Sequence, residues 1–481
     1  MRERLKPEYA VAIVYVAAMF VNILDSTVVT VALPTLSREF DVTTASIEWV
    51  VTGYLLSLAV FIPASGWIGD RIGTKRTFLF AIAVFTGASA LCGLATSLNE
   101  LIAFRILQGV GGGMLTPTGF AMLMRAFPPE RRAAASKVLI IPTAIAPASG
   151  PIVGGFLVDW ASWRWVFYIN LPLGIATFIF GWIFLQEHRE HGAGRFDLPG
   201  FLLSGAGLAL ILYGLSEGPN HGWTSPLVAG TLLAGALAFA LLVIVELRIA
   251  EPMLQLRLIG ERLFRTTMLT STFSTGAFLG ILFIMPLYLQ EARGISAIQS
   301  GLTTFPEAVG VLSFGQLAGR LYPTVGPRRM MAASLTVMSV LLAALTMVDL
   351  DTSLWTIRVL MFMLGATMSF TFIPLQASAF ARIAPSQTGR ASAIYNTQRQ
   401  MASALGVAVL ATILSARFPA AGANLSQSAL ADAEMAAFHA VFIAAAVIAL
   451  IGAAMALLVN DDDAAQTMKA RTQATPAEEA A

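Results

Sequence analysis

Long apolar runs separated by short polar gaps fill most of the chain. Each run reaches about 20 residues, the length that an α-helix needs to cross the hydrocarbon core of a bilayer. The pattern therefore predicts an all-α integral membrane protein with fourteen transmembrane helices. These helices are expected near residues 9–33, 47–69, 77–96, 99–124, 136–158, 164–185, 198–216, 226–247, 264–289, 297–319, 329–348, 354–380, 390–415 and 438–459.

The composition agrees with this pattern. The 481 residues are 57% hydrophobic and 12% charged, whereas a soluble domain carries about 25% charged residues. The first run is longer than the apolar core of a secretory signal, which has about 7–15 residues, so 9–33 is predicted to be a retained helix. Residues 461–481 are polar and lack an apolar period, which predicts a disordered cytoplasmic tail.

The positions of the 30 Lys and Arg residues predict the orientation of the chain. Most of them fall in loops on the same side as the N-terminus. Loops rich in Lys and Arg stay in the cytoplasm. Both termini are therefore expected to be cytoplasmic, which requires an even number of crossings. The predicted outer loops hold only Arg38, Arg164, Arg293 and Arg417.

Two parts of the chain resemble each other. The loop "GWIGDRIGTKR" at 66–76 has a degraded counterpart in "GQLAGRLYPTVGPRR" at 315–329, and Arg105 is echoed by Arg358. Such repeats are typical of secondary transporters, which bind substrate near mid-membrane between the repeats. We expect an N-terminal six-helix bundle (1–190), an inserted two-helix linker region (191–255) and a C-terminal six-helix bundle (256–460).

The second half lacks the acids of the first half. The repeat places Gly319 opposite Asp70 and Ser274 opposite Asp25. The two halves are therefore expected to share a scaffold but not the same chemistry.

Five motifs resemble those of the Major Facilitator Superfamily, specifically its fourteen-helix drug:proton antiporters. The loop at 66–76 is similar to the loop signature of the superfamily, and "RILQGVGGG" from Arg105 is similar to its fourth-helix motif. "SGPIVGG" at 149–155 resembles the fifth-helix motif of antiporters. "LDSTVVTVALP" at 24–34 and "NTQRQMASALG" at 396–406 are similar to the first-helix and thirteenth-helix motifs.

The resemblance covers residues 8–460 and implies a function. It implies a bacterial multidrug efflux protein of the cell inner membrane, which exports hydrophobic or amphipathic, often cationic compounds in exchange for protons by rocking its two halves. It implies a monomer without cofactors, with accessory envelope proteins as further partners. The alternatives are an exporter dedicated to one natural product, antibiotic or lipid, and a membrane receptor or scaffold that transports nothing. Uptake by symport is disfavoured by "SGPIVGG".

The loop after the second helix combines glycines with charges. Its glycines allow a helix end to approach a neighbouring helix closely, and its acid can face the positive N-terminus of another helix. Residues 388–390 are the expected partner, because the resemblance implies that the thirteenth helix crosses the cytoplasmic interface. The loop is interpreted as a latch that stabilises the outward-open state; alternatively, its basic residues only keep it cytoplasmic. The latch residues are Gly66, Gly69, Asp70, Arg71, Gly73, Lys75 and Arg76.

Asp25 is the leading candidate for the proton site. It lies about 16 residues into the first helix, roughly two-thirds of the way across at 1.5 Å per residue, where a charged carboxylate is costly and usually functional. Asn22 shares its helical face, so both are expected to line one cavity. The alternative is a structural acid that is paired permanently with an arginine.

Arg105 lies a few residues inside the fourth helix, in the same outer half as Asp25. The two could meet, and a change in their separation would then couple conformation to proton affinity. Gln108 shares the helical face of Arg105. Arg105 could instead bond backbone carbonyls of its neighbours.

Two charged residues lie deep in the second half. Glu307 follows Pro306 in the tenth span, and Arg399 lies at a similar depth in the thirteenth. Either they neutralise each other, or Glu307 offers a second proton or cation site. Asn396 and Arg399 are three residues apart and line one polar face.

The fifth span is rich in glycine and proline. Such a helix is kinked and closely approached by its neighbours. The resemblance implies that it seals one side of the interface between the halves; a packed bend is the alternative. The motif residues are Gly150, Pro151, Gly154 and Gly155.

A pliable substrate pocket could be formed by side chains of the ninth and twelfth spans, although such residues more often face lipid or the core. The candidate substrate-binding residues are Asn22, Gln108, Phe283, Tyr288, Met363, Gln376, Asn396 and Arg399.

Other chemistry is excluded by the sequence. "GVGGGML" lacks the Lys-Ser/Thr ending of a P-loop, so ATP hydrolysis is not encoded in this chain. The four histidines lack metal-ligand spacing, so no metal site is expected, and the long spans leave no nucleic-acid-binding domain. We expect a transporter driven by the proton gradient, not an enzyme.

Overall fold

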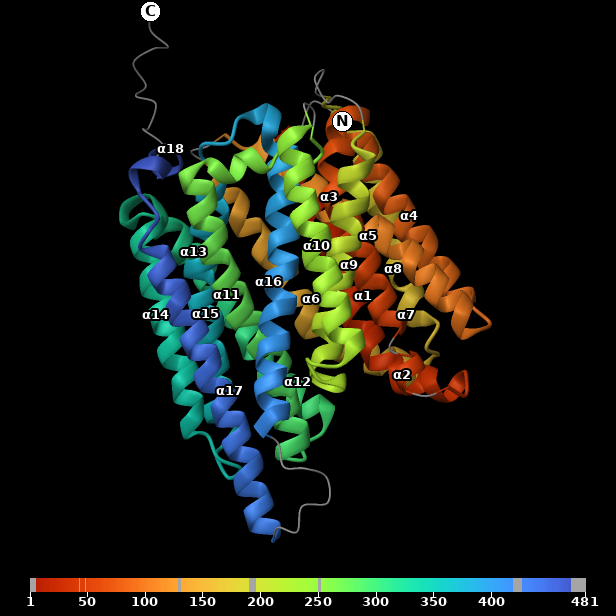
Figure 1. The fold of residues 1–481 in the computed structure, drawn as a ribbon, viewed down its shortest axis with the longest axis vertical. Coiled ribbons are helices and arrows are strands. Elements are labelled where there is room, and N and C mark those ends of the chain that lie inside the picture. Colours follow the sequence, from red (N-terminus) through yellow and green to blue (C-terminus); the bar gives the residue numbers. More distant parts are fainter. Residues whose placement is uncertain are drawn as a thin grey trace, which may run out of the picture.

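The computed structural model describes residues 6–42, 44–47, 49–128, 131–189, 196–249, 252–417 and 426–468. This part of the chain is helical throughout and contains no strand. The helices form one elongated bundle, and both ends of the described chain lie at the same end of it (Figure 1). This end is predicted to be cytoplasmic and is called the inner end.

Six long helices build the first half. Helix α5 is preceded by its N-cap residue Ser97, whose side chain accepts the N–H of Glu100. This bond satisfies one of the free donors at a helix start. The helices are α1 (Pro7–Glu39), α3 (Trp49–Ile72), α4 (Thr74–Leu94), α5 (Leu98–Ala126), α6 (Arg132–Trp160) and α8 (Asn170–Phe184), with the short α2 (Thr44–Ile47) and α7 (Trp165–Tyr168) between them.

The second half repeats this construction after an inserted helical hairpin. The hairpin consists of α9 (Leu198–His221) and α10 (Pro226–Arg248), and α9 packs against both α3 and a helix of the second half, α16. The helices of the second half are α11 (Arg262–Leu287), α12 (Ala297–Thr304), α13 (Pro306–Val325), α14 (Pro327–Ala344), α15 (Leu354–Ala379), α16 (Thr388–Arg417) and α17 (Gln427–Ala456).

Eleven helices within the described ranges are long and apolar enough to cross a membrane. Helices α5, α6 and α12 with α13 overlie the other three predicted spans but are not among the eleven. Glycine and polar residues lower the hydropathy of α5 in particular. The all-helical fold is therefore present, while the count of fourteen crossings stays a prediction.

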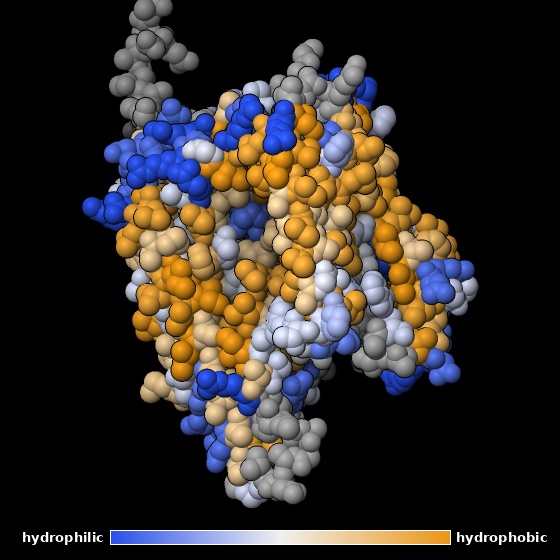
Figure 2. Space-filling view, viewed as in Figure 1, coloured by the Kyte–Doolittle hydropathy of each residue, from blue (hydrophilic) through white to orange (hydrophobic). Residues whose placement is uncertain are grey.

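The outer surface of the bundle is divided by polarity. Figure 2 shows apolar side chains over the middle of one face and polar side chains towards both ends. An apolar band between polar ends is the surface that a bilayer requires of a helical protein.

Proline divides one of the predicted spans. The prediction of a continuous helix over 297–319 is wrong, because α12 ends at Thr304 and α13 starts at Pro306. Proline has no N–H to donate to the preceding turn, and its ring clashes with that turn. Glu307 therefore lies in the first turn of a helix, not in the middle of one.

The predicted disordered tail is ordered over its first eight residues. Residues 461–468 form a 3₁₀ turn (Asp462–Ala464) and the short helix α18 (Ala465–Met468). Residues 469–481 lie outside the described residues.

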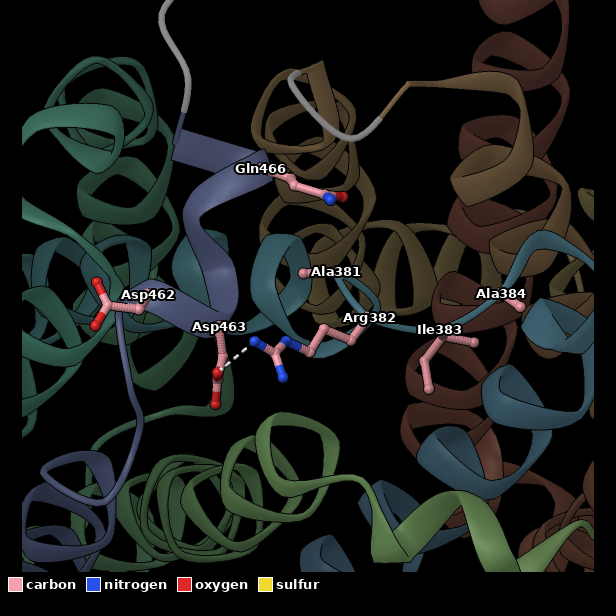
Figure 3. A pocket seen from close by; sticks show the side chains of 7 residues that line it. All are labelled: Ala381, Arg382, Ile383, Ala384, Asp462, Asp463 and Gln466. Carbon is pink, nitrogen blue, oxygen red and sulfur yellow. Dashed lines mark ion pairs between the residues drawn. The ribbon is translucent and has the colours of Figure 1, made fainter.

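Polar contacts explain the order of this segment. The carboxylate of Asp461 accepts the backbone N–H of Arg328 at the start of α14, with 2.8 Å between the atoms. Asp463 forms an ion pair of 2.6 Å with Arg382, beside a cavity of about 460 Å³ (Figure 3). Apolar periodicity could not reveal this order, because the segment is held by polar groups of distant residues.

Candidate functional site

A fully buried polar cluster surrounds Asp25 inside the first half. Arg105 Nη1 of α5 lies 2.6 Å from Asp25 Oδ2, and Gln108 Nε2 donates to Asp25 Oδ1 at 2.9 Å. Asn170 Nδ2, at the start of α8, donates to the same oxygen at 2.6 Å. All four side chains are at most 1% exposed. The predicted contact between Asp25 and Arg105 is therefore present.

Arg105 also bonds the backbone of a neighbouring helix. Its Nε donates to the carbonyl of Val50 in α3 at 3.1 Å, and its guanidinium lies 4.1 Å from the centroid of the Tyr54 ring. A guanidinium carries five N–H donors in a fixed fork, so it can hold a carboxylate and a carbonyl together. Arg105 fills both of the roles that the sequence left open.

The two oxygens of Asp25 accept three donors in this arrangement. An ionised carboxylate only accepts hydrogen bonds, so the cluster fits the charged form of Asp25 balanced by Arg105. Arg105 Nη2 and Asn170 Oδ1 are buried and have no hydrogen-bond partner among the described residues.

Asn22 lies beside the cluster, not within it. An added Cβ on Gly112 would lie 2.7 Å from Asn22 Nδ2 and 3.0 Å from Tyr54 Oη, so these two groups are neighbours. Tyr54 in turn supports Arg105. The predicted neighbour of Asp25 is therefore connected to it through the tyrosine.

Asp70 lies at the inner end of α3 and contacts the second half. It is 2% exposed and pairs with Arg125 Nη2 of α5 at 2.9 Å. An added Cβ on Gly389, in the first turn of α16, would lie 2.6 Å from Asp70 Oδ1. Arg125 Nε also donates to the carbonyl of Pro385, just before α16, at 3.2 Å. The predicted contact between Asp70 and residues 388–390 is therefore present.

Further contacts close the inner end between the two halves. Ser392 Oγ of α16 donates to the carbonyl of Pro117 in α5 at 2.7 Å. The ring of Phe120 in α5 packs edge-on against Phe380, with centroids 5.1 Å apart, and lies parallel to Tyr395 at 6.2 Å. The described conformation is therefore closed at the inner end.

The three glycines of the 66–76 loop have different neighbours. Gly66 faces the second half, since an added Cβ would lie 2.7 Å from the carbonyl of Gly389. Gly69 faces Thr118 of the first half instead. Gly73 precedes α4 with φ of 112°, a conformation that favours glycine. Among the contacts described for this loop, those of Gly66 and Asp70 join the two halves as a latch requires.

The basic residues of the loop hold it to the first half. Lys75 Nζ donates to the carbonyl of Leu185 at the end of α8, at 2.8 Å. Arg76 lies 3.6 Å from Glu187, and Arg71 is exposed. The Arg76 pair is near the surface and contributes little to stability.

Glu307 and Arg399 do not pair in this conformation. Both are half-buried, and no ion pair joins them among the described residues. Arg399 instead lies close enough to Tyr15 of α1 and Tyr395 for its charge to act on both phenols. Arg399 therefore lies near Tyr15 of the first half, and Glu307 remains a separate candidate site.

The candidate substrate residues of the second half do not gather in one place. Tyr288 is fully buried, and its hydroxyl donates to the carbonyl of Asp349 at 3.2 Å. Phe283 and Met363 are 46% and 40% exposed. Tyr288 therefore belongs to the packed core, as one alternative for these residues foresaw.

The two amides of the group are both buried. Asn396 donates to the carbonyl of Ser392 within its own helix at 2.9 Å. Gln376 is 2% exposed, and its Oε1 has no partner in the described part of the chain. A buried amide oxygen without a partner marks Gln376 as a polar position to test.

The glycines of "SGPIVGG" pack against α1. An added Cβ on Gly150 would collide with the side chain of Thr27, and one on Gly154 would lie 3.2 Å from the carbonyl of Val28. Gly155 has no neighbour within 4 Å, and the side chain of Pro151 lies outside the described residues. Gly150 and Gly154 therefore pack on a helix of the first half, and both the bend and the seal stay predictions.

Two residues of the site, Asn170 and Arg125, were not predicted. Asn170 donates to Ser89 Oγ at 3.0 Å as well as to Asp25. A lone amide within an apolar span indicates buried hydrogen bonding, so Asn170 could have been found from the sequence. Arg125 follows directly after its span and had the pattern of an ordinary inner-loop charge. Only the folded geometry brings it to Asp70.

Comparisons with known proteins agree with this fold. The family model described as Major Facilitator Superfamily matches residues 15–407 and 267–479. The chain is 32% identical over 412 residues to the uncharacterized MFS-type transporter YhcA of Bacillus subtilis, covering 86% of this chain and 77% of the relative. It is 32% identical over 404 residues to a multidrug resistance protein B homolog of Mycobacterium tuberculosis, covering 82% and 74%.

Two further similarities extend this result. The chain is 31% identical over 404 residues to the putative multidrug resistance protein MdtD of Pectobacterium carotovorum, covering 82% of this chain and 84% of the relative. Its fold is similar to the crystal structure of the human organic anion transporter MFSD10, with a TM-score of 0.68 and 14% identity, covering 94% and 100%. At that identity the second similarity concerns the fold alone.

Proposed function

This chain belongs to the Major Facilitator Superfamily, and we propose that it is a proton-coupled exporter of hydrophobic or amphipathic, often cationic compounds. Two relatives carry the name of multidrug resistance proteins, which supports export of small compounds. We infer that it works in the inner membrane of a bacterial cell, as a monomer, with the proton gradient as its energy source.

The buried pair of Asp25 and Arg105 carries this proposal. Apolar residues of similar volume often replace a buried ion pair without loss of stability, so stability alone is a poor reason to keep one inside a helical bundle. A proton on Asp25 removes the charge that Arg105 balances. If the two conformations of the protein hold the pair at different distances, proton affinity and conformation are coupled.

The described conformation fits one step of such a cycle. With the inner end closed, Asp25 is ionised and paired. A proton from the outside neutralises Asp25, weakens the pair and favours rocking of the halves, which opens the contact of Asp70 with α16. Asp25 then releases its proton to the cytoplasm, substrate binds from the inside, and the halves return.

Proteoliposomes with an imposed pH gradient test this function. The probes are a lipophilic fluorescent cation and a neutral amphipathic dye, and we expect the gradient to concentrate at least one of them. A protonophore and empty liposomes are the controls. Flux that ignores the gradient would contradict proton coupling, and binding without flux of any probe would favour a receptor. A wider panel of compounds then separates a multidrug exporter from a dedicated one.

A further inference from the structure

The inserted hairpin of α9 and α10 covers the seam where α3 and α16 meet. Helix α10 packs on α9, and α9 packs on both α3 and α16 (Figure 1). Only 17% of the most apolar stretch of α10 is buried inside the protein, so this helix faces mainly outwards. Since α3 and α16 belong to different halves, α9 contacts two bodies that must move against each other in a rocking cycle.

The contact between α9 and α3 includes two pairs of aromatic rings. The rings of Trp49 and Tyr213 stack with centroids 5.9 Å apart, and those of Phe61 and Phe201 lie 5.7 Å apart. Ring pairs of this kind add stability beyond the burial of their surface. They lie at the start and in the middle of α3, so they resist sliding of α9 along it.

The contact between α9 and α16 is made mainly of aliphatic side chains. Leu208 and Leu212 pack with Met401 and Ala404 of α16 and also with Leu56 and Ala59 of α3. No ring pair joins the hairpin to α16 among the described residues. The turn between α9 and α10 adds one hydrogen bond, from Trp223 Nε1 to Thr412 Oγ1 at 3.1 Å. Helices that meet through flexible and small side chains can slide past each other more easily than helices joined by paired aromatic rings.

The inner end of the hairpin is fastened to the segment that follows it. Asp197 accepts the N–H of Met253 at 3.3 Å, and Glu246 accepts the N–H of Leu254 at 3.1 Å. Arg390 in α16 lies close enough for its charge to act on Glu246. The hairpin is therefore joined to its exit segment by hydrogen bonds at the inner end.

We propose that the α9–α10 hairpin moves as a rigid part of the first half and slides along α16, so that the α3–α16 seam stays covered throughout the cycle. This proposal rests on the rocking of the two halves in the proposed function. A hairpin fixed to both α3 and α16 would prevent rocking, so one contact must give way. The aliphatic contact with α16 is therefore the one that slides.

Two cysteine pairs test the proposal in a Cys92→Ser background. The first is Val60→Cys with Gly205→Cys: an added Cβ on Gly205 would lie 3.7 Å from the Cβ of Val60, which suits a disulfide. The second is Trp223→Cys with Thr412→Cys, bridged by a short bifunctional maleimide. The reduced or unbridged form of each variant is its matched control. Flux into proteoliposomes is measured for all four forms.

The oxidised Val60–Gly205 pair is expected to keep most of its flux, whereas the bridged Trp223–Thr412 pair is expected to lose at least about tenfold. The reverse result would attach the hairpin to the second half, and loss or retention of flux in both would also overturn the proposal. Hydrogen exchange at residues 388–395 reports opening of the inner end even if no substrate moves. Exchange that responds to the bridges in a protein without gradient-driven flux would refute proton coupling but not the sliding hairpin.

Discussion

Gly109 of α5 and Gly365 of α15 occupy equivalent places in the two halves. An added Cβ on Gly109 would lie 2.6 Å from a backbone carbonyl of α3, and one on Gly365 would collide with a backbone carbonyl of α13. Each glycine lets two helices cross in close contact. Arg105 lies four residues before the first glycine, and Met361 lies four residues before the second, so Met361 stands opposite Arg105.

The same comparison locates the counterpart of Asp25. Gly150 of α6 contacts Thr27, and Gly406 of α16 contacts Gly276. Asp25 lies two residues before Thr27, so its counterpart is the residue two before Gly276. This residue is Ser274, as the repeat predicted.

The second half therefore builds the same crossing without charges. Gln108 precedes Gly109, and its counterpart is Leu364; Ser274, Met361 and Leu364 are all at most 2% exposed. The scaffold thus packs well with a small polar and two apolar side chains. The charged cluster of the first half is consequently not a requirement of the fold, which points to a role in function.

The comparison of the two halves corrects one pairing of equivalent residues that was inferred from the sequence. Arg358, which was paired with Arg105, lies nearly one turn before Met361, and its guanidinium lies 4.7 Å from the centroid of the Trp355 ring. It is half-buried and does not enter a buried cluster. Equal residue types suggested the pairing, but only the helix contacts define the register.

The inner loops of the two halves have a similar backbone conformation, but only the first loop carries an acid at the position of Asp70. Gly73 and Gly326 both precede a helix with positive φ, 112° and 83°. Counting back from them places Pro323, not the predicted Gly319, opposite Asp70. Proline carries no charge and no N–H donor, so the second loop cannot make the contact that Asp70 makes with α16.

The largest expected effect comes from neutralising the acid that the second half lacks. Asp25→Asn keeps the size of the side chain but fixes a neutral group, so gradient-driven export should be abolished while the protein still inserts and folds. Substrate affinity should also lose its dependence on pH, because proton and substrate affinities change each other reciprocally. Flux in proteoliposomes and substrate binding at several pH values measure both effects.

Glu307→Gln is the matched control for this variant. It neutralises the half-buried acid of the second half and should leave most of the gradient-driven flux. If Asp25→Asn still concentrates substrate while Glu307→Gln does not, the proton site lies in the second half. The double variant then shows whether two protons move in each cycle.

The next largest effect comes from giving the first half the apolar residue of the second. Arg105→Met leaves Asp25 buried without its cation, which costs about 3–5 kcal/mol. The unfolding temperature of the purified protein should fall clearly. Adding Asp25→Ser and Gln108→Leu, which completes the second-half set, should recover most of that stability but no transport. An unchanged unfolding temperature for Arg105→Met would show that the pair contributes nothing to the fold.

These comparisons show what the sequence could predict. The helices were predicted because the apolar runs are a local property of the chain. Asp25 and Arg105 were found because a charge deep in an apolar run is visible without knowing its neighbours. The register of α15 against α5, by contrast, depends on which face of each helix turns inwards, and that information lies in contacts between distant segments.

The contacts of Asp70 and of residues 461–468 also depend on distant segments, so the sequence predicted only some of them. The contact of Asp70 with α16 was expected from the resemblance to a family, whereas its ion pair with Arg125 was not. The order of residues 461–468 was missed because it depends on polar groups that come from α14 and from the segment before α16.

A smaller effect is expected at the latch. Asp70→Asn keeps the shape but removes the charge that faces Arg125 and the start of α16, so transport should slow by about tenfold, which corresponds to about 1.4 kcal/mol. Equilibrium binding of substrate should change little, because the loop is remote from mid-membrane. Arg71→Gln, at an exposed position of the same loop, is the control and should transport normally. Loss of binding in Asp70→Asn with a normal rate of opening would contradict the latch.

The smallest effect is expected where the two halves agree. Glu187 accepts the N–H of Lys75 at 3.1 Å, and Asp461 accepts the N–H of Arg328 at 2.8 Å, so each carboxylate caps the helix that follows the inner loop of its half. Loss of such a cap costs about 0.5–2 kcal/mol. Asp461→Ala and Glu187→Ala should therefore lower the unfolding temperature by similar small amounts and leave flux unchanged, since neither side chain bridges the halves. A loss of flux in Asp461→Ala alone would mean that the ordered tail takes part in the cycle, and the two halves would then differ in their mechanics as well as in their charges.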